Sequence, residues 1–228
     1  MNPIIAVEGV SFAGKTTLTK FLEKEGFSRL YELAEKFGYG AGFPHFPEST
    51  EAAKQSDHWF VQQEVIREQD ALVKATCYPV IADRSFISGL AFSYARKSVF
   101  GLGDPNYQHG VVKEAISEGK LHIPWLIYLK IDLDSLFQRK EKDNARRIKE
   151  YGAAAVANAT IASDEQLFFE KQREFYARLF ANVPHLELDA LQRTQDLAIQ
   201  VRTWSRRLPL QFQTIALDDL LIKPKVEL

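Results

Sequence analysis

The chain carries the stretch Gly9-Val10-Ser11-Phe12-Ala13-Gly14-Lys15-Thr16, which has the Gly-x-x-x-x-Gly-Lys-Thr spacing of a phosphate-binding loop. The apolar residues 4–7 precede it and predict a buried parallel strand. Leu18, Phe21 and Leu22 follow it with the spacing of one helix face. Strand, loop and helix in this order are the context that the pattern requires, so we expect a bound nucleoside triphosphate here.

Each residue type in this loop has a physical reason to bind phosphate. Glycines let the backbone curl so that successive N–H groups face one anion, and the dipole of the following helix adds to the attraction. Lys15 brings a positive charge to the β- and γ-phosphates, and the Thr16 hydroxyl is a hard oxygen ligand for Mg²⁺. The residues expected to contact the nucleotide are Gly9, Ser11, Phe12, Ala13, Gly14, Lys15, Thr16 and Thr17.

Composition narrows the class of protein. The 228 residues are enough for one α/β domain with a good core. The net charge of −1 gives no global signal for nucleic acid or a membrane surface, and no apolar run approaches the roughly 20 residues of a membrane span. Cys77 is the single cysteine, which excludes an internal disulfide, and the first strand leaves no room for a signal peptide. We therefore expect a cytoplasmic protein.

The next segments predict a second strand, a loop and a long helix. Residues 27–32 predict the strand, and residues 38–47, rich in Gly, Pro and aromatic residues, predict a loop at the active-site end. That loop either forms a lid or wall over the substrate or packs back on the core. Residues 57–76 predict the helix, with an apolar stripe formed by Trp59, Val65, Ile66, Leu72 and Val73.

Two glutamines, Gln62 and Gln69, fall on the same predicted stripe of this helix. An amide carries both a donor and an acceptor, which suits the edge of a nucleobase. The alternative is that both amides bond to the backbone or to water at the edge of the stripe.

Residues 79–82 predict a third strand, and Asp83, Arg84 and Ser85 follow it directly. Ligands of open α/β sheets sit outside the carboxyl ends of the strands, so these side chains are expected beside the phosphate loop. Asp83 would hold Mg²⁺ directly or through water, and Arg84 would offer a bidentate fork to a phosphate. A surface ion pair is the alternative. The apolar positions of the next predicted helix are Ile87, Leu90, Ala91, Tyr94 and Ala95.

A basic helix is predicted after the fourth strand, residues 125–131, with Asp132 or Asp134 as its cap. Arg139 and Arg146 are seven residues apart and therefore share a helix face. This helix either closes over transferring phosphates, as part of a lid at about 136–163, or presents a solvated charged face.

The remaining segments complete an alternating α/β pattern. Residues 153–162 are interpreted as mobile lid or its hinge, and residues 163–166 have the pattern of a capping box at a helix start. Residues 185–189 predict a fifth strand and residues 191–206 a closing helix. The tail, residues 208–228, either packs along the domain or reaches a second subunit.

The ordered set of Glu8-Gly9, Gly14-Lys15-Thr16-Thr17, Asp83-Arg84-Ser85 and the lid arginines from Arg139 resembles the thymidylate kinase and deoxynucleoside kinase group of P-loop kinases. The aromatic helix at 168–180 also resembles the helix after the lid in thymidylate kinases. The resemblance implies a P-loop NTPase three-layer α/β sandwich, with a five-stranded parallel sheet, helices on both faces and a helical lid. It spans about residues 4–190, within a kinase domain at 1–207.

The chain combines features of the two subfamilies. Thymidylate kinases usually carry an acidic residue and Gly where this chain has Ser11-Phe12, and an aromatic residue or His where it has Ser85. Deoxynucleoside kinases have that Ser but begin the motif with Glu rather than Asp83. We therefore expect the acceptor site near Phe12 to differ from that of a standard thymidylate kinase. The chain also resembles kinases of other small metabolites, including nicotinamide riboside kinase-like domains, through Glu32-Leu33-Ala34.

The resemblance implies an ATP-dependent phosphotransferase that uses Mg²⁺ on Thr16 and Asp83 and acts on a nucleoside or nucleotide. Glu32 matches the carboxylate base at the end of the second strand, with Glu35 in reserve. The implied catalytic residues are Lys15, Glu32, Asp83, Arg84, Arg139 and Arg146. The implied acceptor contacts are Phe12, Glu32, Trp59, Gln62 and Arg84. Family habit favours a homodimer.

Other functions stay open. The acceptor group is either a hydroxyl or a phosphate, and the acceptor is either a nucleoside or nucleotide or another metabolite, such as an antibiotic hydroxyl. A regulatory ATP-binding module without transfer would keep the loop but tolerate loss of Glu32 and Arg84. A GTPase is disfavoured because the chain has no Asn-Lys-x-Asp motif. Small size and neutral charge disfavour a nucleic-acid motor.

Overall fold

The computed structural model describes residues 2–37, 43–151, 164–209, 211–220 and 222. Five strands form one sheet in the order β2-β3-β1-β4-β5, and every neighbouring pair is parallel. The predicted five-stranded parallel sheet is therefore confirmed. The strands are β1 Ile4–Glu8, β2 Ser28–Leu30, β3 Val80–Asp83, β4 Trp125–Lys130 and β5 His185–Asp189.

The central strand β1 explains why the sheet is covered on both faces. All five of its residues are buried, and its partners are β3 on one side and β4 on the other. A strand buried on both faces is apolar throughout rather than alternating, as residues 4–7 are. The register pairs Val7 with Asp83 and Glu8 with Tyr128, which brings the carboxyl ends of these strands to one edge.

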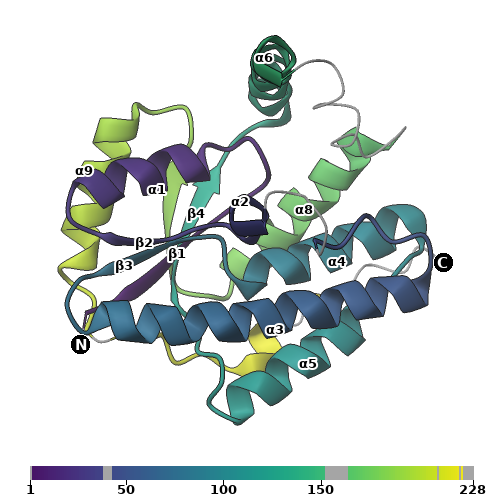
Figure 1. Ribbon diagram of the computed structural model, residues 1–228, viewed down its shortest axis with the longest axis horizontal. Helices are drawn as coiled ribbons and strands as arrows, with labels where there is room; N and C mark the ends of the chain where they lie inside the picture. Colours follow the sequence, from purple (N-terminus) through teal and green to yellow (C-terminus); the bar gives the residue numbers. More distant parts are fainter. Residues whose placement is uncertain (1, 38–42, 152–163, 210, 221, 223–228) are drawn as a thin grey trace.

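Figure 1 shows the sheet as the middle one of three layers, with α1 and α9 on one face and α3, α4, α5 and α8 on the other. Helix α6 lies beyond the carboxyl ends of the strands. No helix among the described residues is both long and apolar enough to cross a membrane. The helices are α1 Lys15–Lys24, α2 Leu33–Phe37, α3 Thr50–Ala75, α4 Phe86–Phe100, α5 Pro105–Ser117, α6 Leu133–Tyr151, α8 Glu165–Phe180, α9 Thr194–Ser205 and the short 3₁₀ helix η1 Leu217–Leu220.

Aspartate side chains cap the amino ends of α5 and α6. Asp104 caps α5 by accepting the backbone N–H groups of Asn106 and Tyr107. Asp132, rather than Asp134, caps α6, since its carboxylate accepts the Ser135 N–H at 2.8 Å. The predicted capping box at 163–166 falls partly outside the described residues, and its Asp164 makes no side-chain cap bond.

The predicted apolar stripe of α4 is confirmed, since all five of its residues are buried. The predicted stripe of α3 is wrong in part. Val65 and Leu72 are half-buried against the core, but Ile66 is 49% exposed and Val73 is 71% exposed, and Gln62 and Gln69 also face solvent. The buried face of α3 instead carries small and charged residues, namely Ala53, Ser56, Asp57, Val61, Arg67, Ala71 and Ala75. Its charges are partnered by other elements, which sequence periodicity cannot show.

The aromatic loop and the tail both pack on the domain. Phe43 lies edge-on to Trp59, with ring centroids 5.8 Å apart, and Phe46 lies edge-on to Phe100 at 5.3 Å. These contacts agree with the packed interpretation of the loop, of which residues 38–42 lie outside the described part. In the tail, the Gln211 carbonyl accepts the Ile4 N–H, so this segment runs along the domain at the amino end of β1.

Gly9 is required where β1 turns into the phosphate loop. Its φ is +138°, and a Cβ there would lie 2.6 Å from the Leu129 carbonyl oxygen. We expect Gly9→Ala to lower the free energy of unfolding by about 3 kcal/mol or more, from backbone strain and the clash together. Gly26→Ala is the matched control, because its φ is +98° with open space around it. Urea unfolding of both variants tests this, and equal losses would contradict it.

Candidate active site

The phosphate loop is a tight turn whose lysine is held inside it. Lys15 is 4% exposed, and its Nζ donates to the Val10 carbonyl at 2.6 Å. Gly14 and Phe12 have φ values of +100° and +63°, so both residues have a left-handed backbone conformation. Burial, followed by the charge of Arg84, lowers the pKa of Lys15 to about 7. Neutral and charged Lys15 are therefore both populated near neutral pH.

This pKa predicts proton uptake when ATP binds. A triphosphate beside Lys15 favours the charged amine, so the nucleotide complex binds a proton that the free protein lacks. At pH 8 we expect uptake of about 0.9 proton per ATP by Lys15, and at pH 6 about 0.1. Calorimetric binding heats in two buffers of different ionisation enthalpy measure this, with Lys15→Met as the control. Equal buffer dependence in both proteins would contradict the prediction.

Arg84 joins the carboxyl end of β3 to the loop and to β2. Its Nε donates to Glu32 Oε1 at 2.6 Å, its Nη1 donates to the Gly9 carbonyl, and its Nη2 donates to Ser11 Oγ at 3.2 Å. Through Arg84, Glu32 therefore lies beside the phosphate loop. Burial raises the pKa of Glu32, but the charges of Arg84 and Lys15 outweigh it and hold the pKa below its ordinary value. The carboxylate is ionised at neutral pH.

Glu35, the reserve candidate, has a different partner. It accepts two hydrogen bonds from Arg29 of β2, at 2.5 and 3.4 Å, and also pairs with Lys20. The guanidinium of Arg29 is almost fully buried and lies 3.4 Å from Asp83 Oδ2. Glu35 thus neutralises Arg29, while Glu32 is the carboxylate that reaches the loop through Arg84.

Asp83 has the features of a metal-binding carboxylate. It is fully buried, and its Oδ2 is held by Arg29 and by Thr19 Oγ1 at 3.5 Å. Its Oδ1 is buried and has no hydrogen-bond partner, and no partner is found in the described chain for the Thr16 hydroxyl. An orphaned carboxylate oxygen and a free hydroxyl fit one Mg²⁺ completed by phosphate oxygens and water. Within the described ranges, no group of three His, Cys, Asp or Glu side chains could hold a metal alone.

A buried carboxylate at the end of β1 lies behind Arg84. Glu8 is 0% exposed, and its oxygens accept hydrogen bonds from Ser85 and Ser88, each at 2.6 Å, and from Tyr176 at 3.1 Å. Ser88 Oγ also accepts from Arg84 Nη1 at 3.2 Å. Burial raises the pKa of Glu8, although the two serines lower it in part. Glu8 thereby fixes the hydroxyl groups that orient Arg84.

The backbone at Arg84 is strained and clamped from α3. Its φ is +68°, a left-handed conformation that non-glycine residues adopt rarely. Arg67 Nη2 donates to the carbonyls of Asp83 at 3.2 Å and Arg84 at 3.3 Å, while its Nη1 pairs with Glu64 at 2.6 Å. This contact explains why a buried arginine stands on α3.

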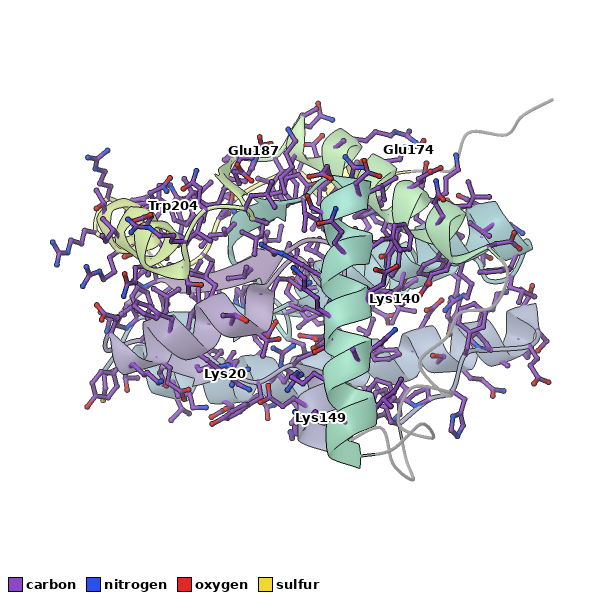
Figure 2. The ribbon with its side chains drawn as sticks, turned by 90° about the horizontal axis from the view of Figure 1, so that it is seen from above. Lys20, Lys140, Lys149, Glu174, Glu187 and Trp204 are labelled. Carbon is purple, nitrogen blue, oxygen red and sulfur yellow. The ribbon has the colours of Figure 1, made fainter. Side chains whose placement is uncertain are left out.

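The predicted lid helix crosses the carboxyl edge of the sheet, as Figure 2 shows from above, with Lys140 and Lys149 labelled along it. Arg139 reaches the phosphate loop: its Nη1 donates to the Ala13 carbonyl at 2.8 Å and its Nη2 to the Ala190 carbonyl at 2.6 Å. Arg146 is 59% exposed and pairs with Asp143 of the same helix. Residues 153–162, interpreted from the sequence as lid or hinge, lie outside the described part.

Three of the predicted acceptor contacts, Phe12, Trp59 and Gln62, lie on the phosphate loop and on α3. Phe12 lies edge-on to Phe169 of α8, with centroids 6.4 Å apart. Trp59 belongs to an aromatic cluster with Phe37, Phe43 and Phe60. Gln62 bonds to His58 at 2.9 Å on the exposed side of α3, and among the described residues it makes no hydrogen bond to Glu32 or Arg84. Thr17 is exposed beyond the loop.

Sequence reasoning assigned no role to three charged groups of this site. Glu8 stands at a strand end directly before the loop, so the rule that selected Asp83 could have found it. Arg29 is a charge within a short strand, and Arg67 a charge on a helix that the apolar pattern placed in the wrong rotation. A charge within a predicted strand was the available signal for Arg29, whereas the predicted stripe placed Arg67 on the exposed side of its helix and gave no signal for it.

Comparison with known proteins gives structural relatives only. No protein-family model and no curated protein matches the chain. A deoxyadenosine kinase from M. mycoides, solved with dCMP and dCDP, superposes with a TM-score of 0.59 at 17% identity, covering 90% of this chain and 100% of that chain. The same enzyme with dCTP gives 0.59 at 16% identity, covering 90% and 100%. A thymidylate kinase from Candida albicans gives 0.57 at 15%, covering 94% and 98%.

At these identities the likeness establishes the fold. The α/β sandwich of P-loop kinases predicted from the sequence is confirmed over nearly the full chain. The structures named above are a deoxyadenosine kinase and a thymidylate kinase, from the two kinase groups that the sequence resembles.

Proposed function

We propose that the protein is an ATP-dependent phosphotransferase that acts on a nucleoside or nucleotide. One observation carries the proposal: Arg84 bridges Glu32 and the phosphate loop, with 2.6 Å to Glu32 Oε1 and 3.2 Å to Ser11 Oγ. A site that only stored ATP would need the loop but no ionised carboxylate tied to it. The bridge places a group suited to an acceptor beside the phosphates that would be transferred.

On the donor side, the loop N–H groups and Lys15 would bind the β- and γ-phosphates. Arg139 lies at the outer rim of the loop, where its guanidinium already touches the Ala13 carbonyl. Arg146 would need a rotation of its exposed side chain to approach the same phosphates. Together these cations would neutralise charge that spreads over the transferred group.

Thr16 and Asp83 would hold Mg²⁺, since each has an oxygen free for it. The ion would shield the charge of the phosphate oxygens when bound. Arg29 fixes Asp83 by its other oxygen, Oδ2, so that Oδ1 keeps one orientation. This arrangement is the chain's own contribution to the metal site.

On the acceptor side, Glu32 would accept the proton of a substrate hydroxyl. The described chain offers no hydrogen-bond partner to its Oε2, which is the oxygen available for this. The acceptor O–H bond breaks, a bond forms from that oxygen to the γ-phosphorus, and the bond from the γ-phosphorus to the β–γ bridging oxygen breaks to release ADP. With a phosphate acceptor no proton is abstracted, and Glu32 would orient the substrate instead.

The nucleoside or nucleotide class is supported by the nucleotides bound in the structural relatives, which include dCMP, dCTP and dATP. Trp59, Gln62 and Phe12 remain the proposed acceptor contacts. The resemblance also favours a homodimer in the cytoplasm, and light scattering tests the dimer. Kinases of other small metabolites are the alternative class of acceptor.

ATP consumption over a broad acceptor panel tests the proposal. The panel holds nucleosides, nucleotides, nicotinamide riboside and aminoglycosides, and each compound is also screened by thermal shift beside a non-hydrolysable ATP analogue. We expect one nucleoside or nucleotide both to raise the melting temperature and to stimulate ADP formation. Stimulation by another metabolite alone would show that the acceptor belongs to that metabolite's class and is not a nucleoside or nucleotide. ATP binding with no stimulation across the panel would favour a regulatory module.

A further inference from the structure

A recess separate from the candidate active site lies on the outer part of the sheet, between β4, β5 and α8. Its volume is about 320 Å³, at the lower end for small-molecule pockets. Figure 2 labels a residue on two of its bordering elements, Glu187 on β5 and Glu174 on α8. None of its lining residues belongs to the phosphate loop or to the set Glu32, Asp83 and Arg84. We call it the β5 groove.

The β5 groove is lined by a tyrosine whose hydroxyl has no partner among the described residues. Tyr128 is 5% exposed, and its ring stacks on Phe180 with centroids 4.8 Å apart. Its hydroxyl bonds to no residue in the part of the chain that the structure describes. Burial raises the pKa of Tyr128 to about 12, so the hydroxyl stays protonated and is a hydrogen-bond donor at physiological pH.

A guanidinium without a hydrogen bond faces the same space. Arg173 lines the groove from α8 and is half-buried. Across the described ranges it makes no hydrogen bond and no ion pair, although its charge reaches the Tyr128 hydroxyl and the Asp132 carboxylate. An arginine fork with open donors beside a phenol donor is suited to a carboxylate or a phosphate.

The remaining walls favour a flat apolar body attached to that anion. Phe180 and His185 present rings whose centroids are 4.5 Å apart. At the rim, Lys130 pairs with Glu187 at 3.0 Å, so the acidic group is already neutralised. With one acid against two bases, the lining is net positive, which favours an anion.

We propose that the β5 groove binds a small organic anion carried on a flat ring, an aryl carboxylate or an aryl phosphate. The anion lies between Arg173 and the Tyr128 hydroxyl, and the ring packs on the half-buried His185 beside Phe180. This site is separate from the phosphate loop and does not depend on the proposed phosphotransfer.

The test titrates benzoate and phenyl phosphate into the full-length chain saturated with a non-hydrolysable ATP analogue, observed by ligand NMR. We expect saturable binding that Arg173→Gln weakens about tenfold or more and that Tyr128→Phe weakens severalfold. Arg178→Gln removes the same charge from the same helix outside the groove and is expected to leave binding unchanged. Thermal unfolding of each variant verifies that it is folded.

Several results would overturn the proposal. One is no saturable binding of either probe up to about 10 mM. Another is equal binding by wild type and both groove variants. If inorganic phosphate binds as tightly as phenyl phosphate, the groove does not recognise the ring, and the proposed aryl ligand is wrong. A wild-type dimer that Arg173→Gln dissociates in light scattering would make the groove a subunit interface instead. Because the readout is binding, none of these results bears on phosphoryl transfer.

Discussion

Lys15→Met is expected to lower phosphoryl transfer by about 10³-fold or more, because it removes the charge closest to the transferred phosphate. Met keeps most of the volume of Lys15, which is almost fully buried against the loop, so the variant should remain folded. The measurement is the initial rate of product formation at saturating ATP and saturating acceptor, together with a thermal unfolding curve.

Lys24→Met is the matched control for this prediction. Lys24 lies in the last turn of the same helix and is exposed. We expect its rate to stay within about twofold of wild type, since surface charges far from the site contribute little. Retained transfer in Lys15→Met would show that the chemistry takes place elsewhere in the chain.

Glu32→Gln is expected to lower turnover by about 10²- to 10⁴-fold if the acceptor is a hydroxyl, because an amide cannot take the proton. ATP binding should be nearly unchanged, since Glu32 contacts Arg84 rather than the loop itself. Single-turnover rates and ATP affinity, measured separately, make the distinction. Because the pKa of Glu32 is lowered, its carboxylate stays ionised down to the ordinary pKa value of 4.5. Protonation of Glu32 is therefore expected to reduce turnover only below about that pH.

Two further glutamate variants make this prediction specific. Glu35→Gln removes the partner of Arg29 and is expected to cost turnover much less than Glu32→Gln. Glu48→Gln is a control at an exposed position. Near-normal turnover in Glu32→Gln would contradict the hydroxyl-acceptor mechanism, and a large loss in Glu35→Gln alone would transfer the role of the base to Glu35.

The parts of the site that the sequence predicted are those set by local rules. Residues 4–16 specify a buried strand, a glycine turn and a helix start through neighbours in sequence. Asp83 and Arg84 were predictable because all parallel strands present their carboxyl ends at one edge, whatever their order.

The parts that the sequence did not predict depend on partners far along the chain. Glu8 is stabilised by hydroxyl groups 77 to 168 positions away, and Arg29 meets Asp83 across 54 positions. The apolar periodicity assigns charged residues to the surface. The predicted buried face of α3 was therefore rotated from the observed one, and Arg67 was expected to be exposed. Only the folded structure shows that each buried arginine has a carboxylate or a carbonyl as its partner.

The strand order also has a consequence for synthesis on the ribosome. Ile5 pairs with Trp125, 120 positions later, and its other neighbour is Ile81 of β3. At roughly 5–20 residues per second, the central strand therefore waits several seconds or more for its second partner. Such non-local pairing is slow, and an apolar strand with open edges attracts other chains while it waits. We expect this protein to need chaperone protection until β4 has left the ribosome.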